Sequence, residues 1–123
     1  TVQDYTSGKL FDDAVSYAFY PVDLHTKTGV RPKPLKKGIV PSIPLGALVP
    51  KGSRNLLVAG RCVSSDRLAN SGLRVQASCM GMGQAAAVAA ILAAQGNTTP
   101  SAVPLAEIHG LLKKHGAIIP GKA

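Results

Sequence analysis

The sequence predicts an α/β protein with short strands, a buried helix rich in alanine and glycine, and a helix near the C-terminus. Three stretches support this fold class: an alternating pattern over Val15–Val22, a continuous apolar run over Asn55–Gly60, and an uncharged run over Ala77–Ala94. Of the 123 residues, 46% are hydrophobic and 16% are charged. This composition is sufficient for a hydrophobic core, and it excludes a disordered tail, a coiled coil and a collagen-like repeat.

The N-terminal part of the chain predicts one short helical turn and then a strand. Thr1 and Asp4 resemble a helix cap, and Gly8 ends the turn. The segment Val15–Val22 alternates in the manner of a strand, and Pro21 marks its end or a sheet edge. The side chains expected on its two faces are Val15, Tyr17 and Phe19 on one, and Ser16, Ala18 and Tyr20 on the other.

The middle of the chain predicts a basic loop followed by two strands. Thr26–Gly38 contains prolines and glycines at a density that excludes a helix, so we expect an extended hairpin or loop. Its basic residues are Lys27, Arg31, Lys33, Lys36 and Lys37. Gly38–Pro50 is apolar but interrupted by prolines, as in an edge strand. Asn55–Gly60 is typical of a strand covered on both faces, and Arg61–Asn70 is expected to be a polar loop.

Two helices are predicted in the last part of the chain. The first covers Ala77–Ala94, begins near Ser78 and ends at a cap around Gly96. The second runs from Pro104 to Gly116, and basic side chains in its last turn complement the helix dipole. Its expected buried stripe consists of Leu105, Ile108, Leu111 and Leu112.

Hydropathy suggests a membrane-spanning helix and charge suggests nucleic-acid binding, but the rest of the sequence disfavours both. Ala77–Ala94 is long enough to span a bilayer, but it consists mostly of alanine and glycine and contains Gln84, which favours burial between protein layers. Lys and Arg number 14 against 6 Asp and Glu, giving a net charge of +8. No nucleic-acid-binding signature or interleaved aromatic residue accompanies this charge. We therefore expect neither membrane nor nucleic acid as a partner; a basic module for anionic partners such as nucleic acid remains the alternative function.

The cysteines and histidines do not form a pattern that binds metal. Cys62 and Cys79 have no CxxC arrangement, and His25, His109 and His115 have no zinc spacing with them. We therefore expect no metal site and two reduced thiols, which favours a cytoplasmic location. The chain begins without an initiator methionine, so we expect a truncated N-terminus, and secreted and periplasmic locations stay open.

The segment Gly81–Ala86 formally matches the GxGxx[GA] pattern of dinucleotide binding. That fingerprint requires a strand directly before it and an acidic residue about twenty positions later. Here the apolar run already ends at Gly60, and no acidic residue occurs between Asp66 and Glu107. A helix start remains, whose unpaired N–H groups favour an anionic or carbonyl oxygen. The arginines that precede it are Arg61, Arg67 and Arg74.

The stretch Asn55–Leu92 combines AGRC, RV and CMGMGQAA, each of which is a weak signal alone. Together they resemble the C-terminal signature of a bacterial family of FAD-dependent oxidoreductases with a glutathione-reductase-type flavin fold. Tyr20–His25 resembles a strand of that family's substrate domain, and Ile43–Pro50 its approach to the final flavin strand. Val103–Gly116 resembles its closing helix, so the resemblance covers most of the chain.

This resemblance implies that the chain is the C-terminal fragment of a two-domain, Rossmann-like FAD-binding oxidoreductase. Residues 1–50 would be a portion of the substrate domain, and residues 51–123 the C-terminal strand and helices of the FAD-binding domain. In this family an N-terminal strand, a GxGxxG turn and an acidic residue hold the ADP half of FAD, and this sequence has no such combination. The implied partners are that N-terminal portion, an unknown small-molecule substrate and further copies of the chain. Alone, the chain is expected to be inactive and to bind FAD weakly or not at all.

The resemblance also implies which residues bind FAD. They are Gly60, Arg61, Leu73, Arg74, Val75, Gly83, Gln84 and Ala85. Gly60 would allow the backbone to approach the cofactor, and Arg61 stands where the wider fold class has an aspartate for the ribityl hydroxyls. Leu73–Val75 resembles the segment that passes the pyrimidine edge of the flavin. Gly83–Ala85 would lie in the first turns of the long helix, whose positive end would stabilise negative charge on the ring.

Asp23 and His25 are the implied catalytic pair. Their two-residue spacing on a strand places both side chains on the same face. By resemblance to the substrate domain, they would face the substrate side of the flavin, with His25 as a proton donor or acceptor. The alternative, a surface histidine beside a carboxylate, stays open.

Overall fold

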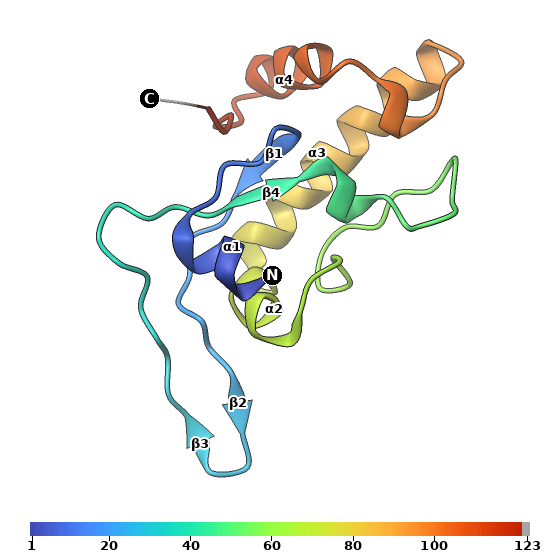
Figure 1. Cartoon of the computed structure of the whole chain (residues 1–123). Coiled ribbons are helices and arrows are strands. Elements are labelled where there is room, and N and C mark those ends of the chain that lie inside the picture. Colours follow the sequence, from blue (N-terminus) through green and yellow to red (C-terminus); the bar gives the residue numbers. More distant parts are fainter. Residues whose placement is uncertain (122–123) are drawn as a thin grey trace.

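The computed structural model describes residues 1–121, and its central element is the long helix α3 (Figure 1). The helices are α1 (Val2–Ser7), α2 (Arg67–Leu73), α3 (Gln76–Gln95) and α4 (Leu105–Lys114), with short 3-10 turns at Leu45–Leu48 and Pro100–Ala102. The strands are β1 (Ala14–Tyr17), β2 (His25–Thr26), β3 (Gly29–Val30) and β4 (Ser42–Pro44). The β2–β3 hairpin projects away from the rest of the molecule (Figure 1). The predicted mixture of helices and short strands is confirmed.

Helix α1 forms where the sequence predicts a helical turn. Thr1 Oγ1 accepts a hydrogen bond from the backbone N–H of Asp4, and the Asp4 carboxylate accepts one from the N-terminus in return. These donors and Lys9, whose Nζ lies 3.1 Å from Asp4 Oδ1, hold the pKa of Asp4 well below its usual range. The turn ends at Gly8, whose φ of 70° is the left-handed conformation that glycine adopts without steric cost.

Strand β1 pairs antiparallel with β4, but it is shorter than the sequence predicts. The predicted strand Val15–Val22 already ends at Tyr17, because its partner β4 has three residues and prolines at its borders lack the N–H a longer ladder needs. The predicted alternation of faces is also wrong: Val15 and Ser16 are both buried, and Phe19 is 74% exposed. Both faces of β1 are therefore covered, and the first exposed large side chains beyond it are Phe19 and Tyr20.

Two predictions about residues 55–70 are wrong. Asn55–Gly60 is not a strand but an extended segment, in which the N–H of Val58 donates to the Leu48 carbonyl at 2.8 Å. Within residues 1–121 no strand lies beside it to form a ladder. The predicted polar loop Arg61–Asn70 contains the start of helix α2, because Asp66 Oδ1 accepts a hydrogen bond from the N–H of Ala69 at 2.8 Å and caps the helix.

Helices α3 and α4 follow the sequence prediction closely. Gly96 caps α3, and Gly116, at φ 79°, follows the last turn of α4. In the predicted stripe of α4, Ile108 and Leu112 are buried and Leu105 and Leu111 are half-buried. By length and composition α3 is able to cross a membrane, and 33% of its apolar window is buried within the protein. Helices in the core of soluble proteins have the same length and composition.

One hydrophobic core joins the two predicted parts of the chain. Val15 and Ile43 from the part before residue 50 pack in the same cluster as Met82 and Ile108 from the part after it. The division of the chain at residue 50 stays a prediction. The core, however, is continuous across it.

The base of the hairpin is anchored to the helices by Tyr5. Its hydroxyl donates to the Tyr20 carbonyl at 2.8 Å, and its ring packs so closely on α2 that a Cβ at Gly72 would lie 2.6 Å from the ring carbon Cζ. Burial raises the pKa of Tyr5 to about 12. This contact fixes where the hairpin leaves the body of the protein.

Candidate functional site

The outer part of the hairpin between β1 and β4 has two different faces, because one antiparallel register holds from the Val22–Lys33 pair to the turn. Val22 pairs with Lys33 through two backbone hydrogen bonds of 3.0 and 2.9 Å, and His25 pairs with Val30 in the same register. Side chains alternate between the faces of a strand. One face therefore carries Val22, Leu24, Thr26, Gly29, Arg31 and Lys33, and the other carries Asp23 and His25.

On the second face, Asp23 is the centre of a small charged cluster. Its Oδ2 lies 3.4 Å from His25 Nε2 and 4.0 Å from the Arg74 guanidinium. Arg74 also donates to the Asp23 carbonyl at 3.4 Å, and the Asp23 N–H donates to Ser71 Oγ at 3.0 Å. The predicted proximity of Asp23 and His25 is confirmed, and the helix junction adds Arg74 to the pair.

The burial of this cluster is uneven. The side chain of Asp23 is 12% exposed, whereas that of His25 is 61% exposed. Asp23 Oδ1 is buried without a hydrogen-bond partner among the described residues. A buried carboxylate beside an exposed imidazole can fix the orientation of the ring for proton transfer. The geometry is thus suited to a proton donor or acceptor at His25.

The short junction between α2 and α3 gathers most of the residues predicted to bind a cofactor. Arg61 Nε donates to the Arg74 carbonyl at 3.3 Å, and Asn70 Nδ2 donates to the Arg61 carbonyl at 3.3 Å. Gly60 precedes this contact with φ at 93°, a conformation that favours glycine, and the space around its missing side chain is open. Gly60, Arg61 and Arg74 therefore lie together at one edge of the molecule.

Helix α3 begins at this junction without a side-chain cap. Its N-cap residue is Val75, which has no hydrogen-bonding side chain, and the next residues Gln76 and Ala77 are exposed. The unpaired N–H groups and the positive end of the helix dipole face outward here. Leu73, in contrast, is 8% exposed and packs into the core. Its predicted contact to a cofactor would involve the backbone rather than the side chain.

The remaining three predicted residues lie further along α3. Gly83 is about 12 Å from Val75 along the helix axis at 1.5 Å per residue, and the space around its missing side chain is open. The Gln84 side chain reaches the carbonyl of His115 at 3.5 Å, and Ala85 has no exposed surface. Ala85 thus packs inside the protein and offers no surface to a cofactor. Of the three, Gly83 has the open surface that a close approach requires.

Two residues that the sequence analysis did not single out position this site. Ser71 holds the backbone of Asp23, and Asn70 holds the Arg61 carbonyl; both lie on α2. The signal for them was present, because Asp66 followed by apolar positions three and seven residues later is typical of a capped helix start. The polarity of Arg61–Asn70, taken alone, favours a loop. Within residues 1–121 no three His, Cys, Asp or Glu side chains cluster as metal ligands, and neither Cys62 nor Cys79 is in a disulfide.

The fold and this site define an α/β protein with two arginines and an uncapped helix start at one edge, a combination suited to an anionic group. The family model described as FAD dependent oxidoreductase matches residues 1–112, and the chain belongs to this family. No curated protein and no solved structure matches the chain significantly. Membership establishes FAD as the family's cofactor and oxidation–reduction as its class of reaction. The resemblance inferred from the sequence is confirmed at this level.

Proposed function

We propose that the chain is the C-terminal segment of a glutathione-reductase-type flavoenzyme and closes over the ribityl and ring portion of FAD. The observation that carries this proposal is the convergence of Gly60, Arg61 and Arg74 at the uncapped start of α3. Outward N–H groups, a positive helix end and two guanidinium groups complement the phosphate and carbonyl oxygens of FAD. The residues present therefore fit the cofactor of the family.

Within this proposal the chain's own residues bind and orient. Gly60 leaves room for a close approach of the backbone, and Arg61 holds the junction through the Arg74 carbonyl. FAD, when bound, supplies the hydride-accepting ring, and the protein supplies position and electrostatics. The start of α3 offers hydrogen-bond donors to whichever cofactor oxygens gain negative charge.

The proposed catalytic pair is Asp23 and His25. The imidazole is the exposed member, so it can exchange a proton with a substrate, while the buried carboxylate orients it from behind. Arg74 links this pair to the α2–α3 junction through its contact with Asp23. The Arg74 side chain therefore connects the proposed proton-transfer pair with the proposed FAD-binding junction.

The exposed apolar surface of α3 supports the proposal that further protein covers it. Met80 is 74% exposed and Ile91 is 50% exposed, and both lie on a helix without a charged residue. In the full-length enzyme the N-terminal FAD-binding portion would cover this face, and in the isolated chain a second copy would do so. We expect the isolated chain to form oligomers in light scattering, and the pair Met80→Glu with Ile91→Glu to shift it toward the monomer. A clean monomer of the unaltered chain would contradict this part of the proposal.

The test of the main proposal is the flavin content of the full-length gene product. We expect it to purify yellow with one FAD per chain, while the isolated 123-residue chain binds FAD weakly and has no activity. Replacing Arg61 and Arg74 together by glutamine is expected to reduce FAD content or affinity at least tenfold. The matched control is Arg67→Gln, because Arg67 is exposed on α2 and forms no ion pair within residues 1–121. A colourless full-length protein would overturn the proposal.

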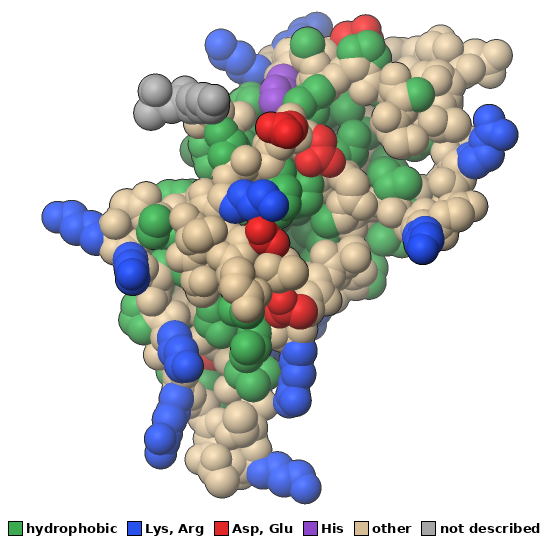
Figure 2. Space-filling view, viewed as in Figure 1, with side chains coloured by type: hydrophobic (Ala, Val, Ile, Leu, Met, Phe, Trp, Pro, Cys, Tyr) green, Lys and Arg blue, Asp and Glu red, His purple; other side chains and the backbone are tan. Residues whose placement is uncertain are grey.

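A basic module for anionic polymers is the second candidate, because the basic side chains of the projecting hairpin are exposed. Figure 2 shows Lys and Arg side chains around the hairpin at the lower end of the molecule. The residues concerned are Lys27, Arg31, Lys33, Lys36 and Lys37. Binding to DNA or heparin that falls steeply with salt would support this function, and weak binding at all salt concentrations would exclude it.

A further inference from the structure

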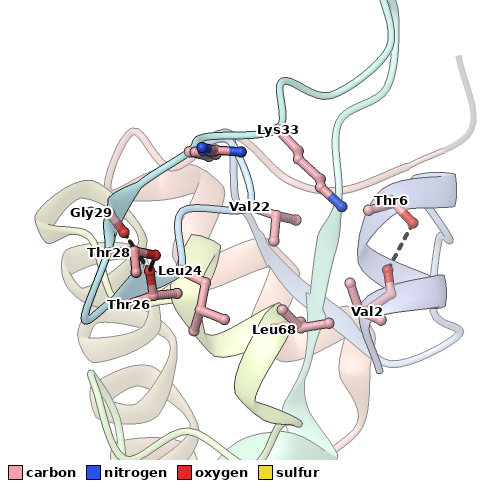
Figure 3. Close-up of a pocket in the computed structure, with 10 residues that line it drawn as sticks. Val2, Thr6, Val22, Leu24, Thr26, Thr28, Gly29, Lys33 and Leu68 are labelled. Atoms are coloured by element: carbon pink, nitrogen blue, oxygen red, sulfur yellow. Dashed lines mark hydrogen bonds between the residues drawn. The ribbon is translucent and has the colours of Figure 1, made fainter.

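The face of the hairpin opposite Asp23 and His25 lines a groove of about 540 Å³. Val22 and Leu24 contribute from the hairpin, Val2 from α1 and Leu68 from α2, and these four side chains form an apolar wall (Figure 3). Drug-sized ligands occupy cavities of roughly 300–1,000 Å³ that are mostly apolar with a few polar groups. The groove is within that range and has no role in the proposed flavin site.

Two cations stand at the rim of this groove. Arg31 lies opposite Leu24 and Lys33 opposite Val22 in the hairpin register, so both share the face that lines the groove. Neither forms an ion pair or a side-chain hydrogen bond among residues 1–121, and no Asp or Glu lines the groove. Figure 3 shows the Lys33 side chain extending toward the side where Thr6 of α1 lies.

The hydroxyl groups in the groove are already used by the protein. Thr6 Oγ1 donates to the Val2 carbonyl at 2.8 Å, and Thr26 Oγ1 donates to the Gly29 carbonyl at 2.7 Å and lies 3.1 Å from Thr28 Oγ1 (Figure 3). The donors left to hold an anionic ligand are therefore the two cations, which stand beside the apolar wall. This combination selects a molecule with one apolar part and one anionic group, and it disfavours cations and polar neutral molecules.

We propose that this groove binds a small carboxylate with an apolar chain or ring, its carboxylate held by Arg31 and Lys33 and its apolar part lying on Val22, Leu24 and Leu68. This site is separate from the proposed FAD site and does not depend on it. Binding requires no flavin, so its failure would leave the proposed function untouched. The occupant is a free small molecule rather than a membrane lipid, because the cations stand beside a recess of about 540 Å³, a volume that matches a single small ligand.

The test uses the 123-residue chain, with sodium decanoate as the probe, in calorimetry and in amide chemical-shift mapping by NMR. We expect decanoate to bind, butyrate to bind at least tenfold more weakly, and decyltrimethylammonium not to bind. The shifts should concentrate on residues 22–33 and on α1 and α2. Equal binding of the anionic and cationic decyl probes, or shifts confined to the exposed face of α3, would overturn the proposal.

Variants separate specific contacts from the overall positive charge. Arg31→Gln with Lys33→Gln should weaken decanoate binding at least tenfold, whereas Lys36→Gln with Lys37→Gln removes the same charge from the same loop and should change it less than twofold. Leu68→Glu places a carboxylate on the wall at a position that is 40% exposed, and it should abolish binding while circular dichroism stays unchanged. Equal effects of the two double variants would contradict the proposal. Tight binding to phosphatidylglycerol vesicles that both double variants weaken equally would assign the hairpin to a membrane surface instead.

Discussion

The two faces of α3 have similar apolar composition but very different surroundings. One face is buried against β1, α4 and the two 3-10 turns, and its residues are Ser78, Met82, Ala85, Val88, Ala89 and Ala93. The other is exposed, and it includes Ala77, Met80, Ala87, Ile91 and Ala94. A helix that is apolar on all sides is usually buried on all sides. The composition of α3 is therefore that of a fully buried helix, but the rest of this chain buries only one of its faces.

The glycines of α3 divide in the same way. A Cβ at Gly81 would collide with Ser16 Oγ of β1, so this glycine permits the close approach of helix and strand. The space beside Gly83 is open. Glycine in the interior of a helix is destabilising by roughly 0.5–1 kcal/mol relative to alanine. At Gly81 the close packing on Ser16 requires glycine despite this cost. At Gly83 no contact within the described residues requires it.

The largest expected effect contrasts one buried and one exposed apolar residue of α3. Met82 has no exposed surface, so Met82→Ala should lower the free energy of unfolding by about 2–5 kcal/mol. Ile91→Ala, on the exposed face, should change it by less than about 0.5 kcal/mol once the chain is diluted to the monomer, where no second copy covers this face. Urea unfolding followed by circular dichroism measures both. Comparable losses in the monomer would mean that the chain itself covers this face in a different fold, whereas an Ile91→Ala loss that disappears on dilution would come from self-association.

A smaller effect is expected at the start of α2, which has a side-chain cap, whereas the start of α3 has none. Asp66→Ala should lower the free energy of unfolding by about 0.5–2 kcal/mol at pH 7, since the N–H of Ala69 loses its acceptor. That hydrogen bond, with a second from Val2, lowers the pKa of Asp66. The carboxylate therefore stabilises the fold above its unfolded pKa of about 3.9, and this contribution is lost as pH falls through the lower, folded pKa.

Measurement of unfolding at pH 7 and at pH 3 checks this prediction with a matched variant. Asp66→Asn keeps a capping oxygen but cannot titrate, so it should recover most of the stability at pH 7 and show a shallower loss in acid than the unaltered chain. Asp4 still titrates in both proteins, so the acid loss should become shallower and not disappear. An unchanged acid slope in Asp66→Asn would show that Asp66 does not contribute to it.

The outcome of the sequence predictions follows from how local each signal is. Thr1, Asp4 and Gly8 specify α1 through neighbours in sequence, and Gly96 and Gly116 end α3 and α4 in the same way, so these elements were predictable. A strand depends on a partner elsewhere in the chain. Asn55–Gly60 has the apolar composition of a strand, but no strand lies beside it within residues 1–121, and the composition alone could not reveal this.

The candidate site shows the same distinction. The pairing of Asp23 with His25 follows from strand spacing and was predictable. Their contact with Arg74 joins residues that are far apart in the sequence, and it depends on where Tyr5 anchors the hairpin and on Ser71 holding Asp23. Such contacts are set by packing, which a single sequence does not display.

The smallest expected effect distinguishes the structural from the functional role of Gly83. In the isolated chain, Gly83→Ala should raise the free energy of unfolding by about 0.5–1 kcal/mol, because alanine is the better helix former and its Cβ enters open space. Gly81→Ala is the matched control two residues away, and its collision with Ser16 should cancel or reverse that gain. Thermal unfolding of both variants measures this difference. If Gly83 lies against FAD in the full-length enzyme, the same Gly83→Ala change should lower FAD affinity there while it stabilises the isolated chain. If Gly83→Ala is more stable and its FAD affinity is unchanged, Gly83 is not part of the cofactor site.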